Sequence, residues 1–257
     1  MRRWLRTLLS LSNLRKALGV SVVFSAIKND YQVTTLNKID FERVLILAPH
    51  PDDDVFGMGG TIKKMASSNV AVTVAYFCDG SSGTPNGVID KGLIEIRKNE
   101  AKAAGKILGV SEQVFFSYPD GKLAAGGASI RALLDLIERK NPDIIYLPSF
   151  LDNHPDHRIV NEILINALTQ KKLDEMPIWG YEVWTPAYIN RLSEISLYIK
   201  TKQEAIRAHE TQLKCRPYDK AILGLNQYRG GMLATGDYAE GFLAMPFKMY
   251  KELYRKS

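Results

Sequence analysis

The chain has 257 residues, of which 46% are hydrophobic and 24% are charged, a balance that is ordinary for a soluble globular protein with a sizeable core. Its two cysteines, Cys78 and Cys215, are too few for a disulfide framework or a cysteine-rich zinc site and fit a reducing compartment. No apolar stretch is long enough to span a bilayer.

The net charge of +6 comes from 34 basic and 28 acidic residues, and it is unevenly placed. Residues 1–19 contain five basic residues and no acidic residue, so the rest of the chain carries only +1. The folded domain is therefore not expected to present a strong basic patch, and we expect no nucleic-acid partner.

Residues 1–40 form a basic N-terminal segment ahead of the domain expected over residues 41–257. Within residues 1–19, one tryptophan and four leucines recur at helical spacing, and Arg2, Arg3 and Arg6 lie on the opposite side. This pattern predicts an amphipathic helix that contacts the cytoplasmic face of an anionic membrane peripherally. A helix packed on its own domain or on another subunit, or a short secretory signal, remains an alternative.

From residue 41 the chain alternates apolar strands with longer helical stretches. Strands are predicted over residues 44–50, 70–80, 114–121 and 144–150. Helices are predicted over residues 61–67, 91–109 and 129–140. This alternation predicts an α/β domain with a mostly parallel sheet that is covered by helices on both faces.

Two polar clusters follow two of these strands. The sequence His-Pro-Asp-Asp-Asp occupies residues 50–54 after the first strand, and Asp-Asn-His-Pro-Asp-His-Arg occupies residues 152–158 after the fourth. Together they hold three of the four histidines. Parallel strands bring both clusters to the same edge of the sheet, outside the carboxyl ends where doubly wound sheets bind ligands.

The chemistry of these clusters points to a metal ion. Three adjacent carboxylates repel one another unless a cation neutralises them. Imidazole and carboxylate suit zinc and neighbouring divalent metals, and a catalytic zinc takes three protein ligands and a water. His50, Asp53 and His157 supply two histidines and one carboxylate, so we expect one Zn²⁺ per chain, or another divalent metal in its place.

Several other interpretations fit parts of this stretch. Asp53 or Asp54 could cap a helix that begins after Gly60 and leave the histidines exposed. The Gly-Met-Gly-Gly sequence at 57–60 resembles a phosphate loop but more simply predicts a tight turn into a helix. Asp52-Asp53-Asp54 could be the D-x-D motif of a metal-dependent glycosyltransferase. Two histidines and a carboxylate also describe non-haem iron oxygenases, which we associate with all-β folds.

Four motifs together resemble a known family: APHPDDD, FSYPDG, NHPDHR and KQEAIRAHETQ. The chain is similar over about residues 44–242 to the zinc-dependent de-N-acetylases related to N-acetylglucosaminyl-phosphatidylinositol deacetylase, also called PIG-L or LmbE-like proteins. The resemblance implies a Rossmann-like fold and removal of an acetyl group from an N-acetylglucosamine moiety. Asp54 departs from the family pattern, which usually has glutamate there.

The resemblance also implies roles for single residues. His50, Asp53 and His157 would hold the metal. Asp52 would act as a general base on the metal-bound water rather than as a ligand, which agrees with the chemistry because zinc lowers the pKa of that water to about 7.

Further roles are implied for residues around the metal. His154 would stabilise the oxyanion or protonate the departing amine, and Asp156 would orient His154 and raise its pKa. Arg97 would contact the sugar or a phosphate of the substrate, although a surface pair with Glu100 explains it nearly as well. His209 would either line the site or support the structure, and we favour support.

The sequence therefore predicts a metal-dependent hydrolase that acts on an N-acetylated amino-sugar conjugate in the cytoplasm. The alternatives are a glycosyltransferase that uses the three aspartates and a non-catalytic sugar-binding relative. The group attached to the sugar and the oligomeric state do not follow from the sequence.

Overall fold

The computed structural model describes residues 33–36, 39–82, 91–233 and 236–256. The amphipathic helix predicted within residues 1–19 lies outside the described residues. No helix of the described part is long and apolar enough to cross a membrane.

The described residues form an eight-stranded sheet in the order β1-β7-β8-β6-β5-β2-β3-β4. All neighbouring strands are parallel except β8, which runs antiparallel to both β6 and β7. The sheet is therefore mostly parallel, as predicted. The strands are β1 (Thr34–Thr35), β2 (Arg43–Ala48), β3 (Ala71–Cys78), β4 (Glu112–Tyr118), β5 (Ile144–Pro148), β6 (Pro177–Tyr181), β7 (Arg191–Glu194) and β8 (Ala239–Pro246).

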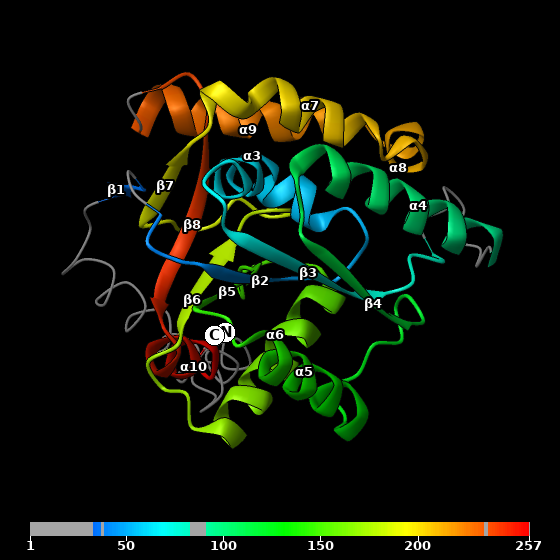
Figure 1. Cartoon of the computed structure of the whole chain (residues 1–257), viewed down its shortest axis with the longest axis vertical. Coiled ribbons are helices and arrows are strands. Elements are labelled where there is room, and N and C mark those ends of the chain that lie inside the picture. The colour runs from blue at the N-terminus through cyan, green and yellow to red at the C-terminus, as the bar shows by residue number, and fades with distance from the viewer. Residues whose placement is uncertain (1–32, 37–38, 83–90, 234–235, 257) are drawn as a thin grey trace, which may run out of the picture.

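Helices cover both faces of the sheet, which confirms the predicted layers (Figure 1). Alternate residues of β2 pack to opposite sides: Val44 and Ile46 belong to one apolar core, and Leu45 and Leu47 belong to the other. The helices of the first face are α3 (Asp53–Ser67), α4 (Lys91–Leu108), α7 (Ile199–Arg207), α8 (Glu210–Cys215) and α9 (Tyr218–Leu233), with the short 3₁₀ helix η1 (Ser196–Tyr198) beside them; those of the second are α5 (Gly127–Lys140), α6 (Pro155–Lys171) and α10 (Phe247–Tyr254).

The order of the strands places the two polar clusters side by side. From β2 the chain passes to β3 and β4 on one side, and it then returns to β5 on the other side of β2. Val44 of β2 lies beside Ile144 of β5, so the segments that follow these strands are neighbours. This reversal is a topological switch point, which is where doubly wound sheets bind their ligands.

Three short strands carry no clear signal in the sequence. β6 begins with Pro177 and contains Gly180, and β7 has only four residues, two of them charged. β1 pairs with β7, so the sheet extends into residues that the sequence assigns to the N-terminal segment. Tertiary pairing rather than local preference forms these short strands.

Helix α3 begins at Asp53, eight residues earlier than predicted, and the tight turn expected at residues 57–60 is wrong. These residues lie inside α3, which is kinked at Met58. A Cβ atom at Gly57 would lie 2.3 Å from the ring of Tyr181, and one at Gly60 would lie 2.7 Å from Ile195. The glycines therefore serve close packing of the helix rather than a turn.

A buried ion pair holds α3 against the sheet. Lys202 donates from Nζ to Glu240 at 2.6 Å, and both side chains are fully buried. The two carboxylate oxygens of Glu240 accept backbone N–H groups of Gly60 and Thr61 in α3. Because each partner neutralises the other, loss of either one would leave an uncompensated buried charge.

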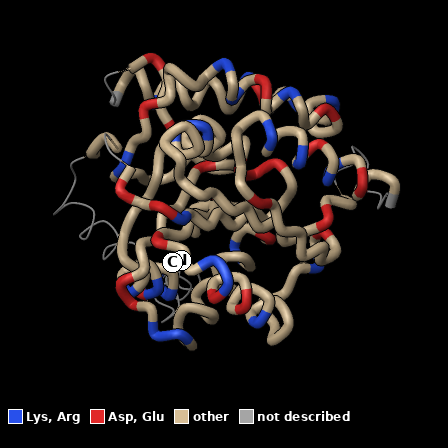
Figure 2. Tube along the Cα trace, in the orientation of Figure 1, with Lys and Arg blue, Asp and Glu red and all other residues tan. Residues whose placement is uncertain are grey.

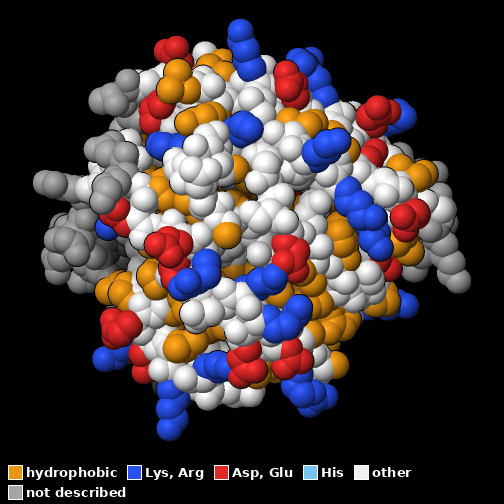
Figure 3. Space-filling model, in the orientation of Figure 1, with side chains coloured by type: hydrophobic (Ala, Val, Ile, Leu, Met, Phe, Trp, Pro, Cys, Tyr) orange, Lys and Arg blue, Asp and Glu red, His pale blue; other side chains and the backbone are white. Residues whose placement is uncertain are grey.

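Charged residues of both signs are interspersed along the described elements (Figure 2). On the face shown in Figure 3, basic and acidic side chains alternate with small apolar areas. The described residues of this face therefore do not form a field of one sign.

The close contact at Gly57 gives a test of the packing. Gly57→Ala should lower the free energy of unfolding by about 1–3 kcal/mol because its methyl group overlaps Tyr181. Gly224→Ala in α9 is the control, since nothing lies within 4 Å of the added atom and alanine favours helix. Urea unfolding of both variants measures the difference. Equal stability of the two variants would contradict this packing.

Candidate metal centre and active site

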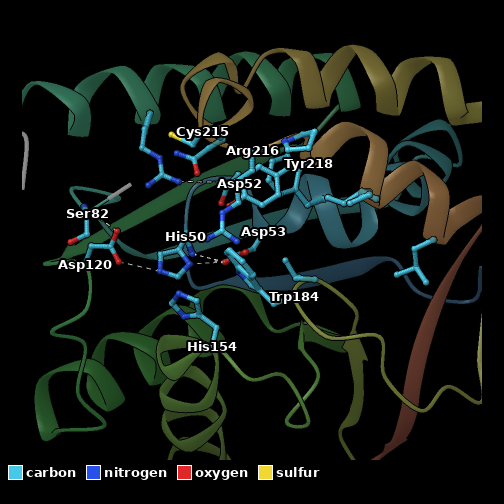
Figure 4. A pocket seen from close by; sticks show the side chains of 18 of the residues that line it. His50, Asp52, Asp53, Ser82, Asp120, His154, Trp184, Cys215, Arg216 and Tyr218 are labelled. Carbon is cyan, nitrogen blue, oxygen red and sulfur yellow. Dashed lines mark hydrogen bonds and ion pairs between the residues drawn. The ribbon is translucent and has the colours of Figure 1, made fainter. Parts of the chain in front are cut away.

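A cavity of about 680 Å³ opens over the carboxyl ends of β2 and β5. Figure 4 shows the side chains that converge there from the segments after β2 and β5 and from neighbouring helices. One end of the cavity is charged, and its lining includes His50, Asp52, Asp53, Arg97, Asp120 and His154. The structure thus brings most of the predicted site residues into one cavity.

Asp53 lies between two histidines. Its Oδ2 atom is 3.1 Å from Nδ1 of His50 and 3.2 Å from Nε2 of His157. The backbone N–H of His50 also donates to this oxygen, at 2.8 Å. His50 follows β2, Asp53 opens α3 and His157 lies in the first turn of α6, so the three side chains come from three elements.

The two spacings from Asp53 fit a tetrahedral metal ion such as zinc. Both ring nitrogens of the buried His157 lack a hydrogen-bond partner among the described residues, although carboxylates lie nearby. Bonds of about 2.0–2.1 Å to a tetrahedral zinc put donor atoms roughly 3.3 Å apart. The observed spacings of 3.1 and 3.2 Å are close to that value, and the donors are those that zinc prefers.

The electrostatics show why a cation belongs here. Burial disfavours the charged form of His50, but the neighbouring Asp53, Asp120 and Asp156 outweigh it and raise the pKa of His50 well above its usual value. Burial likewise opposes the charge on His157, yet its carboxylate neighbours raise its pKa to about 9. The buried carboxylates therefore demand positive charge, from protonated imidazoles or from a metal ion.

Asp120 was not predicted as a site residue. Its Oδ1 is 3.2 Å from Nε2 of His50, and its Oδ2 accepts the N–H of Ser82. Burial raises the pKa of Asp120, but the contact with His50 outweighs this and lowers it to about 2. The Pro-Asp-Gly sequence that contains Asp120 follows β4 and predicts a turn. Because parallel strands end at the same edge of the sheet, this turn also lies near the site.

Two other groups of potential ligand atoms also include His50. In each group these atoms lie within 4.8 Å of one another, and the groups are His50, His154 and His157, and His50, Cys78, Asp120 and Asp156. Asp53 belongs to neither group, although its Oδ2 contacts two imidazole nitrogens directly. We favour the Asp53 set because one oxygen lies between both nitrogens at metal-ligand spacing.

Asp52 and Arg97 form a buried pair at the edge of this centre. Nη2 of Arg97 donates to Oδ2 of Asp52 at 3.1 Å, and its Nη1 donates to the carbonyl of Gly80 at 2.8 Å. Burial raises the pKa of Asp52, and Arg97 offsets only part of that rise. The alternative prediction of a surface pair between Arg97 and Glu100 is therefore wrong, because Glu100 accepts hydrogen bonds from Thr211 instead.

His154 faces the cavity, but Asp156 does not orient it as predicted. The carboxylate of Asp156 lies 3.1 Å from Nε2 of His50, and only its backbone N–H reaches His154, at Nδ1. The backbone of Asp156 reaches His154 because His154 is the N-cap of α6, where its ring accepts an N–H of the first turn. Asp156 does raise the pKa of His154, as predicted, but burial and the neighbouring His50 and His157 outweigh it and lower that pKa.

The hydrogen bond to Nδ1 assigns the tautomer of His154. Since Nδ1 accepts a backbone N–H, a neutral ring carries its proton on Nε2. The backbone N–H of His154 donates to Asp152, which also lies 3.3 Å from His157. Asp152 thus links the two histidines, a role that the sequence does not indicate.

The three adjacent aspartates lie in three different environments. Asp52 contacts Arg97, Asp53 contacts the histidines, and the fully buried Asp54 accepts from the hydroxyl of Tyr76 at 3.0 Å. Asp52 and Asp54 therefore do not converge as a D-x-D motif requires. The expected capping role is also wrong, since Asp52 is the N-cap of α3 and makes no side-chain capping bond.

His209 lies behind the cavity wall, among the buried residues. Its ring packs edge-on against Phe56 with centroids 5.7 Å apart, and burial lowers its pKa to about 3. It occupies the N-cap position of α8 without a side-chain capping bond. These contacts agree with a supporting rather than a lining position.

Fold and site together define a class: a Rossmann-like α/β protein with a histidine–aspartate centre at the switch point of its sheet. Residues 45–168 match the family model described as PIG-L, GlcNAc-PI de-N-acetylase. Over these residues the chain is similar to the PIG-L family.

Relatives agree with this assignment. Diacetylchitobiose deacetylase of Thermococcus kodakarensis is 28% identical over 232 residues, which cover 80% of this chain and 84% of that protein. A Bacillus anthracis protein named "Probable N-acetyl-alpha-D-glucosaminyl L-malate deacetylase 2" is 28% identical over 224 residues, covering 80% and 96%. The structure of N,N'-diacetylchitobiose deacetylase from Pyrococcus horikoshii superposes with a TM-score of 0.72 at 25% identity, covering 90% and 94%.

Asp54 makes the stability depend on pH. Burial raises its pKa to about 7, whereas the unfolded chain releases this proton near pH 4. The folded state therefore binds more protons between these values, and this contribution to stability falls as the pH rises from about 4 to 7. The shift corresponds to a contribution on the order of 4 kcal/mol.

Asp54→Asn keeps a hydrogen-bond acceptor for Tyr76 and cannot ionise, so it should remove this fall of stability with pH. Urea unfolding of both proteins in the presence of a chelator, at pH 4.5 and 7.5, measures the effect. The free energy of unfolding of the variant should increase relative to that of the parent protein as the pH rises. A constant difference between the two proteins would contradict the protonation of buried Asp54.

Proposed function

We propose that this protein is a zinc-dependent amidohydrolase that removes the acetyl group from an N-acetylglucosamine-type amino-sugar conjugate. The observation that carries the proposal is Asp53 held between two imidazole nitrogens, with Asp52 and His154 lining the same cavity. Deacetylation of N-acetylated sugars is also the activity in the names of the relatives.

His50, Asp53 and His157 would hold the metal. Bound zinc lowers the pKa of a water molecule to about 7 and polarises an amide carbonyl. The remaining protein groups then move the proton and stabilise the charge that develops on the substrate.

Asp52 is placed to accept the proton of the attacking water. Its raised pKa suits a base, and Arg97 fixes one of its oxygens. As the water oxygen bonds to the acetyl carbon, its proton passes to Asp52. When the carbon–nitrogen bond breaks, that proton goes to the leaving amine, so the products are acetate and the free amino sugar.

His154 is placed to stabilise the oxyanion of the tetrahedral intermediate. Its neutral ring carries the proton on Nε2, because Nδ1 accepts from the backbone of Asp156. A donor already oriented before the reaction costs no reorganisation as the charge develops. We therefore assign Asp156 to positioning His50 through its carboxylate and His154 through its backbone.

The alternative functions are not favoured. A glycosyltransferase would need two aspartates converging on one metal, and Asp54 is buried against Tyr76 instead. A non-catalytic binding protein would not need a buried carboxylate of raised pKa beside the metal ligands. The relatives are named as deacetylases.

Acetate release tests the proposed reaction. We expect one acetate and one free amine per turnover with at least one member of a panel of N-acetylglucosamine conjugates, with zinc measured on the same sample. The panel should include lipid-linked, nucleotide-linked and thiol-linked glycosides. Turnover that requires a nucleotide sugar and releases no acetate would overturn the proposal in favour of a transferase.

The separation of metal binding from proton transfer gives a second test. Asp52→Asn should lower kcat by roughly 10²–10⁴-fold, the usual contribution of a general base, while zinc content stays near that of the parent protein. His157→Ala should lose both activity and zinc. Equal zinc loss in the two variants, measured by elemental analysis, would make Asp52 a ligand and place the base elsewhere.

We also propose that residues 1–19 attach the enzyme peripherally to the cytoplasmic face of a membrane. The support is their sequence alone: each basic residue near an anionic surface contributes about 1 kcal/mol. Co-sedimentation with anionic vesicles should be strong for the full chain, weak for a chain starting near residue 39, and weaker at high salt. Equal binding of both proteins would contradict this attachment.

A further inference from the structure

Beyond the metal centre, the lining of the cavity includes a set of apolar and aromatic residues, and the polar Gln212, Cys215 and Arg216 line the same cavity. We call the apolar set the apolar arm, and it is formed by Val183, Pro186, Tyr218, Ala221, Ile222 and Leu225. It is continuous with the charged end, because both line the same cavity of about 680 Å³. A substrate whose acetamide reaches the metal therefore has its remaining part beside the apolar arm.

One wall of the apolar arm is a single face of α9. Tyr218, Ile222 and Leu225 are spaced by four and three residues, so their side chains share one side of the helix. Ile222 is buried, and Tyr218 and Leu225 are half-buried. This stripe lines the cavity, and Ile222 and Tyr218 also pack against the apolar core of the same face.

Residues 182–187 contribute another wall of the apolar arm, and hydrogen bonds fix this segment. Glu182 accepts from Nη2 of Arg229 in α9 at 2.6 Å and from the N–H of Ala187 at 2.7 Å. The N–H of Trp184 donates to Asp152 at 3.0 Å, which ties this segment to the metal-binding loop. The apolar arm is therefore formed before substrate binds and keeps its place relative to the metal centre.

Trp184 connects the two ends of the cavity. Its ring lies 5.8 Å from that of His154 and 5.8 Å from that of Tyr218, and it is 41% exposed. In Figure 4 Trp184 and Tyr218 lie on the side of His50 and Asp53 away from Ser82 and Asp120. A group attached to a sugar at the metal centre would pass along Trp184 into the apolar arm.

The lining of the apolar arm selects among kinds of attached group. A second sugar ring needs several hydrogen-bond partners, because each buried polar group left unpaired is costly. Among the six residues of the arm, only the hydroxyl of Tyr218 offers a polar side-chain atom. An alkyl or aryl group needs no partners and gains roughly fourfold in affinity for each methylene group buried.

We propose that the apolar arm binds an alkyl or aryl aglycone, so that the preferred substrate is an amphiphilic N-acetylglucosaminide rather than an oligosaccharide. This inference rests on the proposed function. It assigns the group attached to the sugar, which the sequence leaves open.

The test compares methyl and hexyl N-acetylglucosaminides in the full-length protein. The hexyl compound should be deacetylated with at least a tenfold higher kcat/KM than the methyl compound. Leu225→Gln should lower kcat/KM for the hexyl compound about five- to tenfold and leave that for the methyl compound within twofold. Met232→Gln is the matched control, since Met232 lies on the same helix but is 69% exposed and does not line the cavity; it should change neither value.

Two other results would overturn the inference: equal kcat/KM for both glycosides, or a preference for N,N'-diacetylchitobiose over the hexyl compound. Failure of the proposed function gives a different result, in which neither glycoside releases acetate. Calorimetry then decides about the apolar arm, since hexyl N-acetylglucosaminide should still bind, and bind more weakly to Leu225→Gln. No binding, or binding unchanged by Leu225→Gln, would contradict the inference.

Discussion

The carboxylate of Asp53 between two buried imidazoles is the contact on which the rest of this structure depends. Its Oδ2 atom lies within 3.2 Å of nitrogens from both His50 and His157. Further carboxylates surround the same imidazoles, and their negative charge is what raises the histidine pKa values. A divalent cation relieves this excess without protonating the histidines. Every role assigned to a neighbouring residue presupposes that cation.

The fold brings these groups together by the order of its strands. β2 and β5 are neighbours although their paired residues Ile46 and Tyr146 are 100 positions apart in the chain, and α3, β3, α4, β4 and α5 are inserted between them. Helix α3 must then start directly after His50 for Asp53 to turn back towards the imidazole. The Lys202–Glu240 pair and the close contact at Gly57 hold that helix in place. Residues far from the metal thus fix its geometry.

The sequence predicts the centre of this site because its signals are local. The His-Pro-Asp motifs stand at the ends of apolar strands, and parallel strands carry both motifs to one edge. The glycines at 57–60 are wrongly predicted to form a turn because glycine suits both a turn and a close helix contact. Only the position of Tyr181 against Gly57 shows that the close contact is the reason for them. The role of Asp156 likewise depends on the path of its side chain to His50.

Other parts of the site depend on contacts across the whole chain. The apolar arm joins α9 to residues 182–187, and neither segment shows in sequence that it lines a cavity. Asp120 sits in a turn motif whose function appears only when β4 lies beside β3. The short strands β6 and β7 form because β8 pairs with both of them. Local propensity carries none of this information.

The most direct measurement is the position of bound zinc in crystals of the protein, from anomalous scattering at the zinc absorption edge. We expect one ion whose distances to His50, Asp53 and His157 are about 2.0–2.2 Å, with Asp52 outside the ligand set. An ion held instead by Cys78, Asp120 and Asp156, or no ion at this edge of the sheet, would contradict it.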